Sequence, residues 1–532
     1  MRFKKLAALG LAAVMACSLA VPASAEYVED KELTIETALA SDSDDEFSYS
    51  RIGGLTSYNG TAENVVIPDY VSSISATAFA GNKTVKTITI PANTDSIALG
   101  AFSDCPALTT IKVNSANRTY ESENGVLYRW VNKEKYLHTY PAAKTAKRFT
   151  VPSGVSKVLS NAFKGTSKLQ TLKLSNTVEE LNDLALSGSK SLKTVTITKK
   201  LTTIGKDVFL NSPKLQSITG GNTKFGNGDG YVTKNGVLYS WGGWDLLCYP
   251  EGKTDKTFAM PDEFTGMSYG AQLNNTAIRN NKYLQKITLW GNMQLYDKGY
   301  FSGCSSLASI EVREVEGKRN TLSVKNGVLF GNSNNLIYYP AAKKDTSYTV
   351  PKDTIVPSCA FADTTKLKTL TLSEGVKIPS VLSDNILGNG TSSVAAIKVS
   401  SKHKELSAKD GILYNKDKTT LICVPPQCEK ASLKLPTSVN NIYSKAFTNC
   451  KKIESVEIPR GVTEVFFTNC SALKTVTLPV GIRCIAVENR VDSDAIARFT
   501  GCGSLSKITY KGNRSDIEYY IPEGVKLVCA DD

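Results

Sequence analysis

AFKGTSKLQTLKLSNTVEELNDLALSGSKSLKTVTITKKLTTIGKDVF, residues 162–209, holds three copies of one phrase. Each copy opens with a small or β-branched residue and a large apolar one, and continues with apolar residues at fixed places. The interval between copies is 23 residues. A fixed interval of this length indicates a repeat architecture, in which each copy buries its apolar face against the next. The three copies begin at Ala162, Ala185 and Val208.

The phrase recurs twelve times along the chain, which predicts a stack of about twelve turns around one continuous core. Within a copy, Leu172-Lys173-Leu174 alternates as a short strand with one buried face does. Stacked copies should therefore form a parallel sheet, and the phenylalanines that share one place in the phrase should form an interior column. The copies begin at Ala78, Ala101, Ala162, Ala185, Val208, Ala277, Tyr300, Ala360, Ile386, Ala446, Phe466 and Arg498.

Four inserted segments interrupt the stack and match one another. Each opens with Asn-Gly or Asp-Gly followed by apolar and aromatic residues, and each returns to a proline. Two apolar segments joined by a short turn predict a β-hairpin. In the second segment, Trp241-Gly242-Gly243-Trp244 fits a two-residue turn between facing tryptophans. The hairpins are expected near residues 117–150, 221–260, 313–350 and 400–435.

Eleven cysteines remain beyond residue 25, an odd number for a secreted chain. Five of them occupy the fifth place of the phrase, where other copies carry Asn, Ser or Thr. Such a place is a tight interior turn, so we expect small buried thiols there rather than a disulfide framework. The five are Cys105, Cys304, Cys450, Cys470 and Cys502.

Residues 1–25 have the pattern of a secretory signal peptide, with a basic start, an apolar run and a small-residue cleavage site that ends at Ala25. Processing as a lipoprotein at Cys17 is the alternative. Residues 26–45 are acidic and serine-rich, which predicts a disordered leader. Residues 511–532 are expected to form a C-terminal cap and tail. The expected location is extracellular or at the cell surface.

The net charge of +13 is unevenly distributed. Residues 1–25 carry three basic residues and residues 26–46 a net charge of −8, which leaves +18 on the remainder. A basic surface of this kind attracts polyanions at low ionic strength. A lysine-rich, solvated exterior explains the same charge without any partner.

The repeats and hairpins together resemble a known family. Repeats that read Ala-Phe, then Gly or Asn, Cys, and spaced Leu and Ile up to a proline, with hairpins of the Asp-Gly-Val-Leu-Tyr type between them, resemble the BspA-type (Treponema pallidum-type) leucine-rich repeats of bacterial surface proteins. The resemblance covers residues 46 to about 510. It implies a leucine-rich-repeat solenoid, mainly β with stacked parallel strands, a short helical or irregular segment in each repeat, and four inserted β-hairpins. It also implies a binding or adhesion role, and it carries over no individual binding residue.

The sequence predicts no catalytic residue, no cofactor site and no metal site, and therefore no enzyme. The two histidines, His138 and His403, lie in separate hairpin regions, and no nucleophile triad or phosphate-binding loop accompanies them. His138 stands among Tyr136, Leu137, Thr139 and Tyr140, which favours a place on a hairpin face over a role as general base.

Aromatic residues gather at the hairpins, whereas the outward positions of the repeat strands are mostly Thr, Ser and Lys. Because interface energy is concentrated in Trp, Tyr and Arg, the outward strand face is a poor candidate for ligand binding. Cross-strand pairing within the hairpins explains the aromatic residues, and a binding surface for sugars or protein loops is the alternative. Under that alternative the candidate ligand-binding residues are Trp130, Trp241, Trp244, Tyr128 and Tyr239.

We therefore expect a secreted or cell-surface, non-catalytic scaffold that binds a protein or polysaccharide of a host or of bacteria, such as an extracellular-matrix protein or an anionic wall polymer. The alternative is a structural protein of the envelope or biofilm matrix, held to wall polyanions by its basic surface. We expect no specific nucleic-acid partner, and no apolar stretch beyond the signal peptide reaches the ~20 residues that a membrane span needs.

Overall fold

The structure is a computed structural model that describes residues 46–222, 230–241, 245–263, 272–273, 276–295, 299–378, 385–388, 392–486, 496–521 and 524–532. The predicted signal peptide (1–25) and acidic leader (26–45) lie outside the described residues. The chain divides into two compact units, Met1–Leu192 with Thr203–Val208, and Lys193–Thr202 with Phe209–Asp532. Both units are built as a β-solenoid, as the repeats predict.

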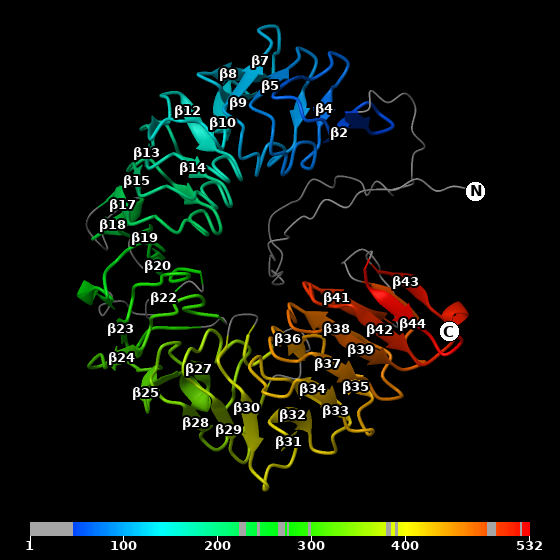
Figure 1. Cartoon of the computed structure of the whole chain (residues 1–532). Coiled ribbons are helices and arrows are strands. Elements are labelled where there is room, and N and C mark those ends of the chain that lie inside the picture. The colour runs from blue at the N-terminus through cyan, green and yellow to red at the C-terminus, as the bar shows by residue number, and fades with distance from the viewer. Residues whose placement is uncertain are drawn as a thin grey trace. The chain divides into compact units, whose positions relative to one another are not determined.

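One wall of the solenoid consists of the alternating ends of the repeats, stacked as parallel strands (Figure 1). In the first unit its strands are β3 (Asn64–Val66), β5 (Thr87–Ile90), β7 (Thr110–Val113), β11 (Arg148–Thr150) and β13 (Thr171–Lys173). In the second unit they are β15 (Thr194–Ile197), β17 (Ser217–Gly220), β21 (Thr257–Ala259), β23 (Lys286–Trp290), β24 (Ser309–Arg313), β28 (Ser347–Val350), β29 (Thr369–Leu372), β30 (Ala396–Val399), β34 (Ser432–Lys434), β37 (Ser455–Glu457), β39 (Thr475–Leu478), β42 (Lys507–Tyr510) and β44 (Lys526–Val528).

The alternation of these strands sets both their register and their buried face. Ile88 and Ile111 pair in parallel and are fully buried, whereas Thr89 and its partner Lys112 face outward. Neighbouring side chains of a strand point to opposite faces, so this register keeps the alternate apolar residues, such as Ile88 and Ile111, on the buried face. The predicted parallel sheet is thereby confirmed.

The solenoid makes about 19 turns, more than the twelve copies of the phrase. Each copy supplies one strand of the wall just described. The additional strands have the alternation of the phrase but lack its opening pair of residues, as in Arg148-Phe149-Thr150, which is why the repeat pattern alone undercounts the turns. These additional strands are β3, β11, β21, β28, β34 and β44.

A second wall holds shorter strands and the hairpins. In the first unit it contains β1 (Phe47–Tyr49), β2 (Leu55–Tyr58), β4 (Ser73–Ile74), β6 (Ser96–Ile97), β8 (Tyr120–Glu123), β9 (Val126–Val131), β10 (Glu134–Thr139), β12 (Val155–Val158), β14 (Glu180–Leu181) and β16 (Thr203–Ile204). In the second unit it contains β18 (Tyr231–Lys234), β19 (Val237–Trp241), β20 (Asp245–Cys248), β22 (Gln272–Leu273), β25 (Ser323–Lys325), β26 (Val328–Phe330), β27 (Leu336–Tyr338), β31 (Leu406–Lys409), β32 (Ile412–Asn415), β33 (Thr420–Cys423) and β35 (Asn441–Ile442). A separate five-stranded sheet of the second unit has the order β36 (Phe447–Thr448), β38 (Val465–Thr468), β41 (Ile496–Thr500), β40 (Cys484–Ala486) and β43 (Glu518–Tyr520).

Each predicted hairpin carries a third antiparallel strand in front of the two that the sequence predicts. In the first hairpin β8 pairs with β9 and β9 with β10, and β10 then pairs in parallel with β12 of the next turn. The leading strands, such as Tyr120–Glu123, are short and mostly polar, so no apolar pattern in the sequence predicts them. The hairpins are thus continuous with the second wall.

An interior column of aromatic rings runs along the repeats, as the shared place of the phenylalanines predicts. The rings of Phe79 and Phe102 lie 5.6 Å apart, and those of Phe447 and Phe467 lie 4.6 Å apart. At a hairpin the column continues through the tyrosine that precedes the returning proline, because Tyr140 stacks on Phe163 at 5.2 Å. The hairpin turns therefore share the core of the repeats.

The tight turn of eleven copies has a left-handed residue that the sequence analysis missed. These residues, at the fourth place of the phrase, have a positive φ, and all are Gly, Asn or Asp, the residue types that tolerate this conformation. In several copies the residue that follows donates a side-chain hydrogen bond to the preceding turn, as from the Cys105 thiol to the Phe79 carbonyl at 2.9 Å or from the Ser189 hydroxyl to the Phe163 carbonyl at 3.3 Å. The five cysteines at this place are free and buried, as predicted. The left-handed residues are Gly81, Asp104, Gly165, Gly188, Asn211, Asn280, Gly303, Asp363, Asn449, Asn469 and Gly501, and in the copy that begins at Ile386 this place lies outside the described residues.

The segments that connect the strands are turns rather than helices, so the irregular form of the predicted connection is the one found. Among the described residues the named helical elements are the short 3-10 helices η2 (Asn332–Asn334) and η3 (Arg514–Asp516). Within the same residues no helix has the length and apolar character needed to cross a bilayer.

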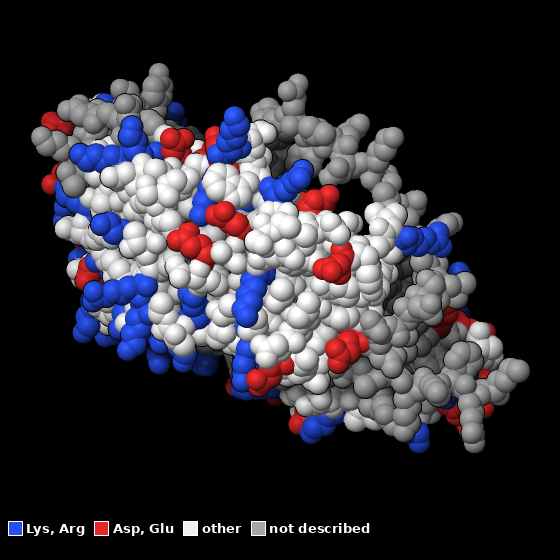
Figure 2. All heavy atoms as spheres, turned by 90° about the horizontal axis from the view of Figure 1, so that it is seen from above, with Lys and Arg blue, Asp and Glu red and all other residues white. Residues whose placement is uncertain are grey.

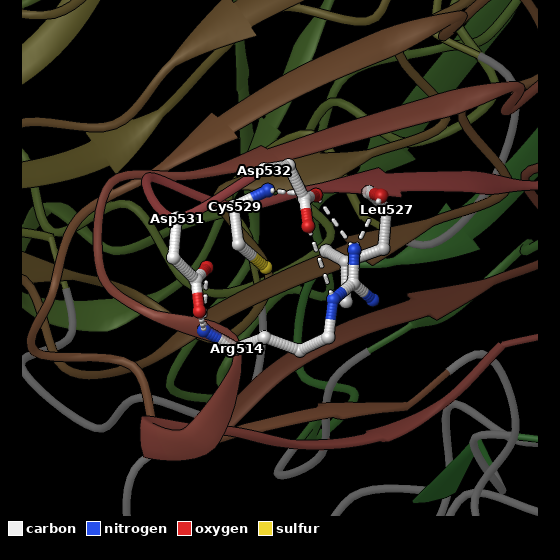
Figure 3. A network of polar contacts seen from close by, with 5 residues as sticks. All are labelled: Arg514, Leu527, Cys529, Asp531 and Asp532. Atoms are coloured by element: carbon white, nitrogen blue, oxygen red, sulfur yellow. Dashed lines mark hydrogen bonds and ion pairs between the residues drawn. The ribbon is translucent and has the colours of Figure 1, made fainter.

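A polar cluster ties the last strand to η3 (Figure 3). The Arg514 guanidinium donates to the Asp532 carboxylate at 2.6 Å and to the Leu527 carbonyl at 3.1 Å. The Cys529 amide donates to Asp532 at 2.7 Å, and Asp531 accepts from the Arg514 amide at 3.0 Å. The hydrogen bond from Arg514 holds the pKa of Asp532 below its ordinary value. This cluster fits the cap expected for residues 511–532.

Candidate binding surface

The first hairpin, β8 to β10, contains a tight turn and has two faces. Asn124 and Gly125 have φ angles of 51° and 76°, the pair of left-handed residues that a two-residue hairpin turn requires. Beyond the turn, Tyr128 pairs with Leu137 and Trp130 with Lys135. Because paired residues share a face, Tyr128 and Trp130 lie on the same side of the hairpin.

Tyr128 and Tyr239, two of the predicted ligand-binding residues, lie at equivalent places in the first and second hairpins and are each 1% exposed. Their rings belong to the core, and burial raises the pKa of both hydroxyls. The Nζ of Lys135 lies 4.3 Å from the centre of the Tyr128 ring and covers its outer side. These two residues therefore have the stabilising role that cross-strand pairing predicts.

Trp130 is the predicted ligand-binding residue that reaches the surface of the first hairpin, with 39% of it exposed. Its cross-strand partner Lys135 lies between two carboxylates, 2.5 Å from Glu121 and 3.2 Å from Glu123. Burial alone would raise the pKa of Glu121, but hydrogen bonds from Lys135 and from the Trp130 side chain outweigh burial and lower it. We call Glu121, Glu123, Trp130 and Lys135 the Trp130 cluster.

The Trp130 cluster is held in place by its charges. Burial would lower the pKa of Lys135, whose side chain is 13% exposed, but the hydrogen bonds from Glu121 and Glu123 raise it. Lys135 therefore stays charged, and it remains fixed between the two carboxylates and the Tyr128 ring. The result is an exposed tryptophan ring next to a charged lysine and two carboxylates.

The opposite face of the hairpin is polar and largely satisfied. The Tyr136 hydroxyl donates to Glu134 at 3.1 Å, and Lys157 lies 5.4 Å from the centre of the Tyr136 ring. Lys157 is also paired with Glu180 at 2.9 Å. Tyr136 and Lys157 thus have partners within the protein, whereas the Nε of Arg129, the residue paired with Tyr136, is buried without one.

The second hairpin is described only in part. The backbone of Trp241 ends β19 and pairs with Tyr231, at the place that Trp130 has in the first hairpin. Trp244 and the predicted two-residue turn at Gly242-Gly243 lie outside the described residues. Their roles as ligand-binding residues stay predictions.

The two histidines are structural. His138 is 1% exposed; its Nε2 donates to the Ile97 carbonyl at 3.1 Å and its Nδ1 accepts from the Thr139 hydroxyl at 2.9 Å. His403 is 3% exposed, and its Nδ1 accepts from the amides of Glu405 and Leu406. Across the described part of the chain, no group of three or more His, Cys, Asp or Glu side chains is placed to hold a metal ion.

Surface charge is mixed, with a basic excess. Figure 2 shows acidic side chains among the basic ones on one face, with large uncharged areas between them. Several acidic residues are paired with a lysine of the neighbouring strand, as in Lys286–Glu311 at 2.6 Å and Lys86–Glu63 at 2.6 Å. In the described residues Lys112, Lys173 and Lys507 are exposed and have no such partner.

Sequence reasoning proposed Trp130 as a ligand-binding residue and missed the neighbouring Glu121 and Lys135. The alternation of side chains along a strand could have revealed these neighbours. Tyr128 and Trp130 are two residues apart and therefore share a face with the residues paired to them on the neighbouring strands. This reasoning requires knowing that β8 is part of the hairpin, and the polar sequence of β8 does not predict a strand.

Comparisons place the chain among known repeat proteins. The family model described as BspA type leucine rich repeat region matches in six copies, over residues 51–124, 139–228, 263–339 and 426–527. A search of curated protein sequences gives no match.

Three solved structures illustrate the similarity. A leucine rich cell surface protein from Faecalibacterium prausnitzii is 17% identical, with 90% of this chain and 97% of that chain covered and a TM-score of 0.31. The pneumococcal vaccine antigen PcpA is 18% identical, with 77% and 93% covered and a TM-score of 0.31. A leucine-rich repeat protein from Bacteroides ovatus is 17% identical, with 92% and 100% covered and a TM-score of 0.24. Because the family model covers more than half of the chain, and the repeats have the geometry described above, this protein belongs to the family of BspA-type leucine-rich repeat proteins.

Proposed function

We propose that this protein is a secreted or cell-surface, non-catalytic binding scaffold, and that the Trp130 cluster contacts its protein or polysaccharide ligand. The observation that carries the proposal is the 39% exposure of Trp130 on a hairpin whose other large aromatic residue on the same face is buried. The signal-peptide pattern of residues 1–25 supports the location. Hosts and other bacteria are the expected sources of the ligand.

An exposed tryptophan ring is suited to recognition. Tryptophan supplies a large contact area, and Trp130 extends from a strand whose inner part is fixed by the buried Tyr128. The exposed parts of Glu121 and Glu123 offer hydrogen-bond acceptors near the ring. This combination matches sugar hydroxyl groups or the polar groups of a protein loop.

The test is a binding screen of the purified mature chain against a glycan array and extracellular-matrix proteins. For any ligand found, Trp130→Ala should weaken binding at least about tenfold, as the loss of an interface tryptophan commonly does. Lys416→Ala is the matched control, because Lys416 has the place of Trp130 in the fourth hairpin. Unchanged affinity in Trp130→Ala, or an equal loss in Lys416→Ala, would contradict the proposed site.

A second candidate function rests on the net charge of +18 beyond residue 46. A structural role in the envelope or biofilm matrix would use unpaired lysines such as Lys112 and Lys173 to hold an anionic wall polymer. Attachment of this kind weakens steeply as salt rises, because exposed charges are screened within about 10 Å at 0.1 M ionic strength. Binding that survives high salt and depends on Trp130 favours the first candidate, and binding that disappears in high salt and ignores Trp130→Ala favours the second.

A further inference from the structure

Three cysteines of the second unit lie on consecutive turns at the same place of the repeat. Phe447 pairs with Phe467 and Phe467 with Phe499, so the residues three positions further on, Cys450, Cys470 and Cys502, follow in register. The ring centres of these phenylalanines lie 4.6 Å and 5.1 Å apart, which fixes the spacing of the turns. No other three cysteines of the chain stand at this place on consecutive copies.

Each of the three thiols points along the stack toward the turn before it. The Cys470 thiol donates to the Phe447 carbonyl at 3.2 Å and the Cys502 thiol to the Phe467 carbonyl at 3.7 Å, so each reaches toward the turn before it. The Cys450 thiol donates to the Val424 carbonyl at 3.8 Å, so all three thiols lie at the same place on successive turns. Turns of a parallel stack repeat at about 4.8 Å, and a disulfide joins Cα atoms about 4.4–6.8 Å apart.

Two other cysteines at the same place provide an internal contrast. Cys105 and Cys304 are fully buried and donate to the carbonyls of Phe79 and Ile278. Their counterparts in the preceding copies are Asn82 and Asn281, so neither thiol has a thiol beside it in that turn. All five thiols are buried and donate to a carbonyl of the turn before. Cys105 and Cys304 differ from the other three cysteines in having no cysteine at the same place on either neighbouring copy.

We propose that Cys450, Cys470 and Cys502 form a redox site in which one disulfide bond joins Cys470 to either of its neighbours. Because Cys470 belongs to both pairs, only one bridge exists at a time and the third thiol stays reduced. That thiol can attack the bridge and move it along the stack without further oxidant. The bridge would cross-link turns that are otherwise joined by backbone hydrogen bonds and packing.

The oxidant in this proposal is a small-molecule disulfide, of the kind met outside the cell. A cysteine thiolate attacks the oxidant, one sulfur–sulfur bond breaks, and a mixed disulfide and one free thiol result. A second cysteine of the cluster then attacks the mixed disulfide and releases the other half as a thiol. One oxidant disulfide and two protein thiols thus give one protein disulfide and two small thiols.

Exposure predicts the order of events. Cys502 is 7% exposed, whereas Cys450 and Cys470 are each 1% exposed. The oxidant should therefore reach Cys502 first, and the bridge between Cys470 and Cys502 should form before the bridge between Cys450 and Cys470. The pKa of Cys502 is raised by its hydrogen bond with Cys470 and by burial, so the reaction should be slow at neutral pH and faster at alkaline pH.

The test uses the full chain incubated with oxidised glutathione under conditions where circular dichroism shows it folded. The reaction is stopped by denaturation with an alkylating agent, and cross-linked peptides are identified by mass spectrometry without reduction. We expect the Cys470–Cys502 bridge first and the Cys450–Cys470 bridge later. Cys105 and Cys304 should be recovered alkylated.

Serine variants separate the pairs. Serine fits this place, since Ser189 occupies it in another copy and donates to the same kind of carbonyl. Cys470→Ser should abolish both bridges, Cys450→Ser should leave the Cys470–Cys502 bridge and its rate unchanged, and Cys502→Ser should slow the oxidation severalfold. The proposal is overturned if the folded chain forms no bridge at Cys470, or if Cys105 or Cys304 becomes cross-linked as quickly as Cys470.

Discussion

The first and fourth hairpins share their inner halves and differ at their tips. Tyr128 and Tyr414 are 1% and 2% exposed, pair across the hairpin with Leu137 and Leu421, and follow turns whose first residue has a positive φ. These parts face the common core of the solenoid, where close packing tolerates few shapes. The inner half is therefore the same in both hairpins.

The tips are free of that constraint. In the first hairpin β9 and β10 have six residues each, and Trp130 is 39% exposed. In the fourth, β32 and β33 have four residues each, and Lys416 at the same place donates to the carbonyl of His403 at 2.5 Å. Trp130 is thus exposed to solvent, whereas Lys416 is hydrogen-bonded within the protein. Function can vary at the tip while the base of the hairpin keeps the fold.

The largest expected effect tests the shared inner half. Tyr128→Ala and Tyr414→Ala should each lower the free energy of unfolding by about 3–5 kcal/mol, because each removes a buried aromatic ring and leaves a cavity. Denaturant titration followed by circular dichroism measures both. A large loss in one variant and almost none in the other would mean that the two hairpins do not dock on the core in the same way.

A pH-dependent effect should distinguish the first hairpin, because His138 is replaced by Ile422 in the fourth. Burial lowers the pKa of His138 from 6.5 to about 4. Between these values the unfolded chain binds a proton and the folded chain does not. The stability is therefore fully present above pH 6.5 and is lost as the pH falls toward 4, by about 3 kcal/mol in total.

His138→Gln removes this titration and keeps a donor for the Ile97 carbonyl. Free energies of unfolding measured from pH 7 to pH 4 should fall less steeply for the variant than for the parent chain. Parallel curves would show that His138 is protonated equally easily in both states.

A smaller effect concerns the aromatic column. The hydroxyl of Tyr140 is buried without a hydrogen-bond partner, and burial raises its pKa to about 12. Val424, at the same place in the fourth hairpin, has no polar group to bury. Tyr140→Phe should therefore raise the free energy of unfolding by about 1 kcal/mol, since it removes an unsatisfied polar group.

Tyr120→Phe is the matched control, because the Tyr120 hydroxyl accepts a hydrogen bond from the Ile97 amide at 2.8 Å. It should lower stability by about 1 kcal/mol. Thermal and denaturant unfolding of the two variants should therefore move in opposite directions, and movement in the same direction would refute the assignment.

The smallest expected effect is at the turns. In the fourth hairpin Lys430 pairs with Asp410 at 2.9 Å, with 43% and 49% of their side chains exposed. Lys430→Ala should lower the free energy of unfolding by no more than about 0.5 kcal/mol, and high salt should remove the difference. A salt-independent loss above about 1 kcal/mol would assign the turn a larger role than an exposed ion pair has.

Much of the scaffold could be predicted from the sequence, because a repeated core repeats its sequence. The alternation at Ile88 and Ile90, the column through Phe79 and Phe102 and the buried Cys105 all follow from places that recur in the phrase. The left-handed turn could also have been predicted, since its place in the phrase holds only Gly, Asn or Asp.

The candidate site was predictable only in part. Hairpin aromatics were identified as a group, but whether an aromatic side chain meets the core or the solvent depends on which face of the hairpin packs inward. Tyr128 and Trp130 share a face and differ by two residues, yet one lies over the core and the other beyond its edge. Both carboxylates beside Trp130, Glu121 and Glu123, come from β8, a strand with no apolar pattern.

The sequence by itself determined the period, the strand alternation, the hairpin turns and the small residues of the tight turn, because each is dictated by local backbone geometry or by a core that every copy must share. Tertiary structure decided where the core ends. That boundary buries Tyr128 and exposes Trp130, places Lys135 between two carboxylates, and brings three thiols, separated by 20 and 32 residues in sequence, onto consecutive turns. Burial at these places depends on which turns lie side by side, and local sequence does not record that.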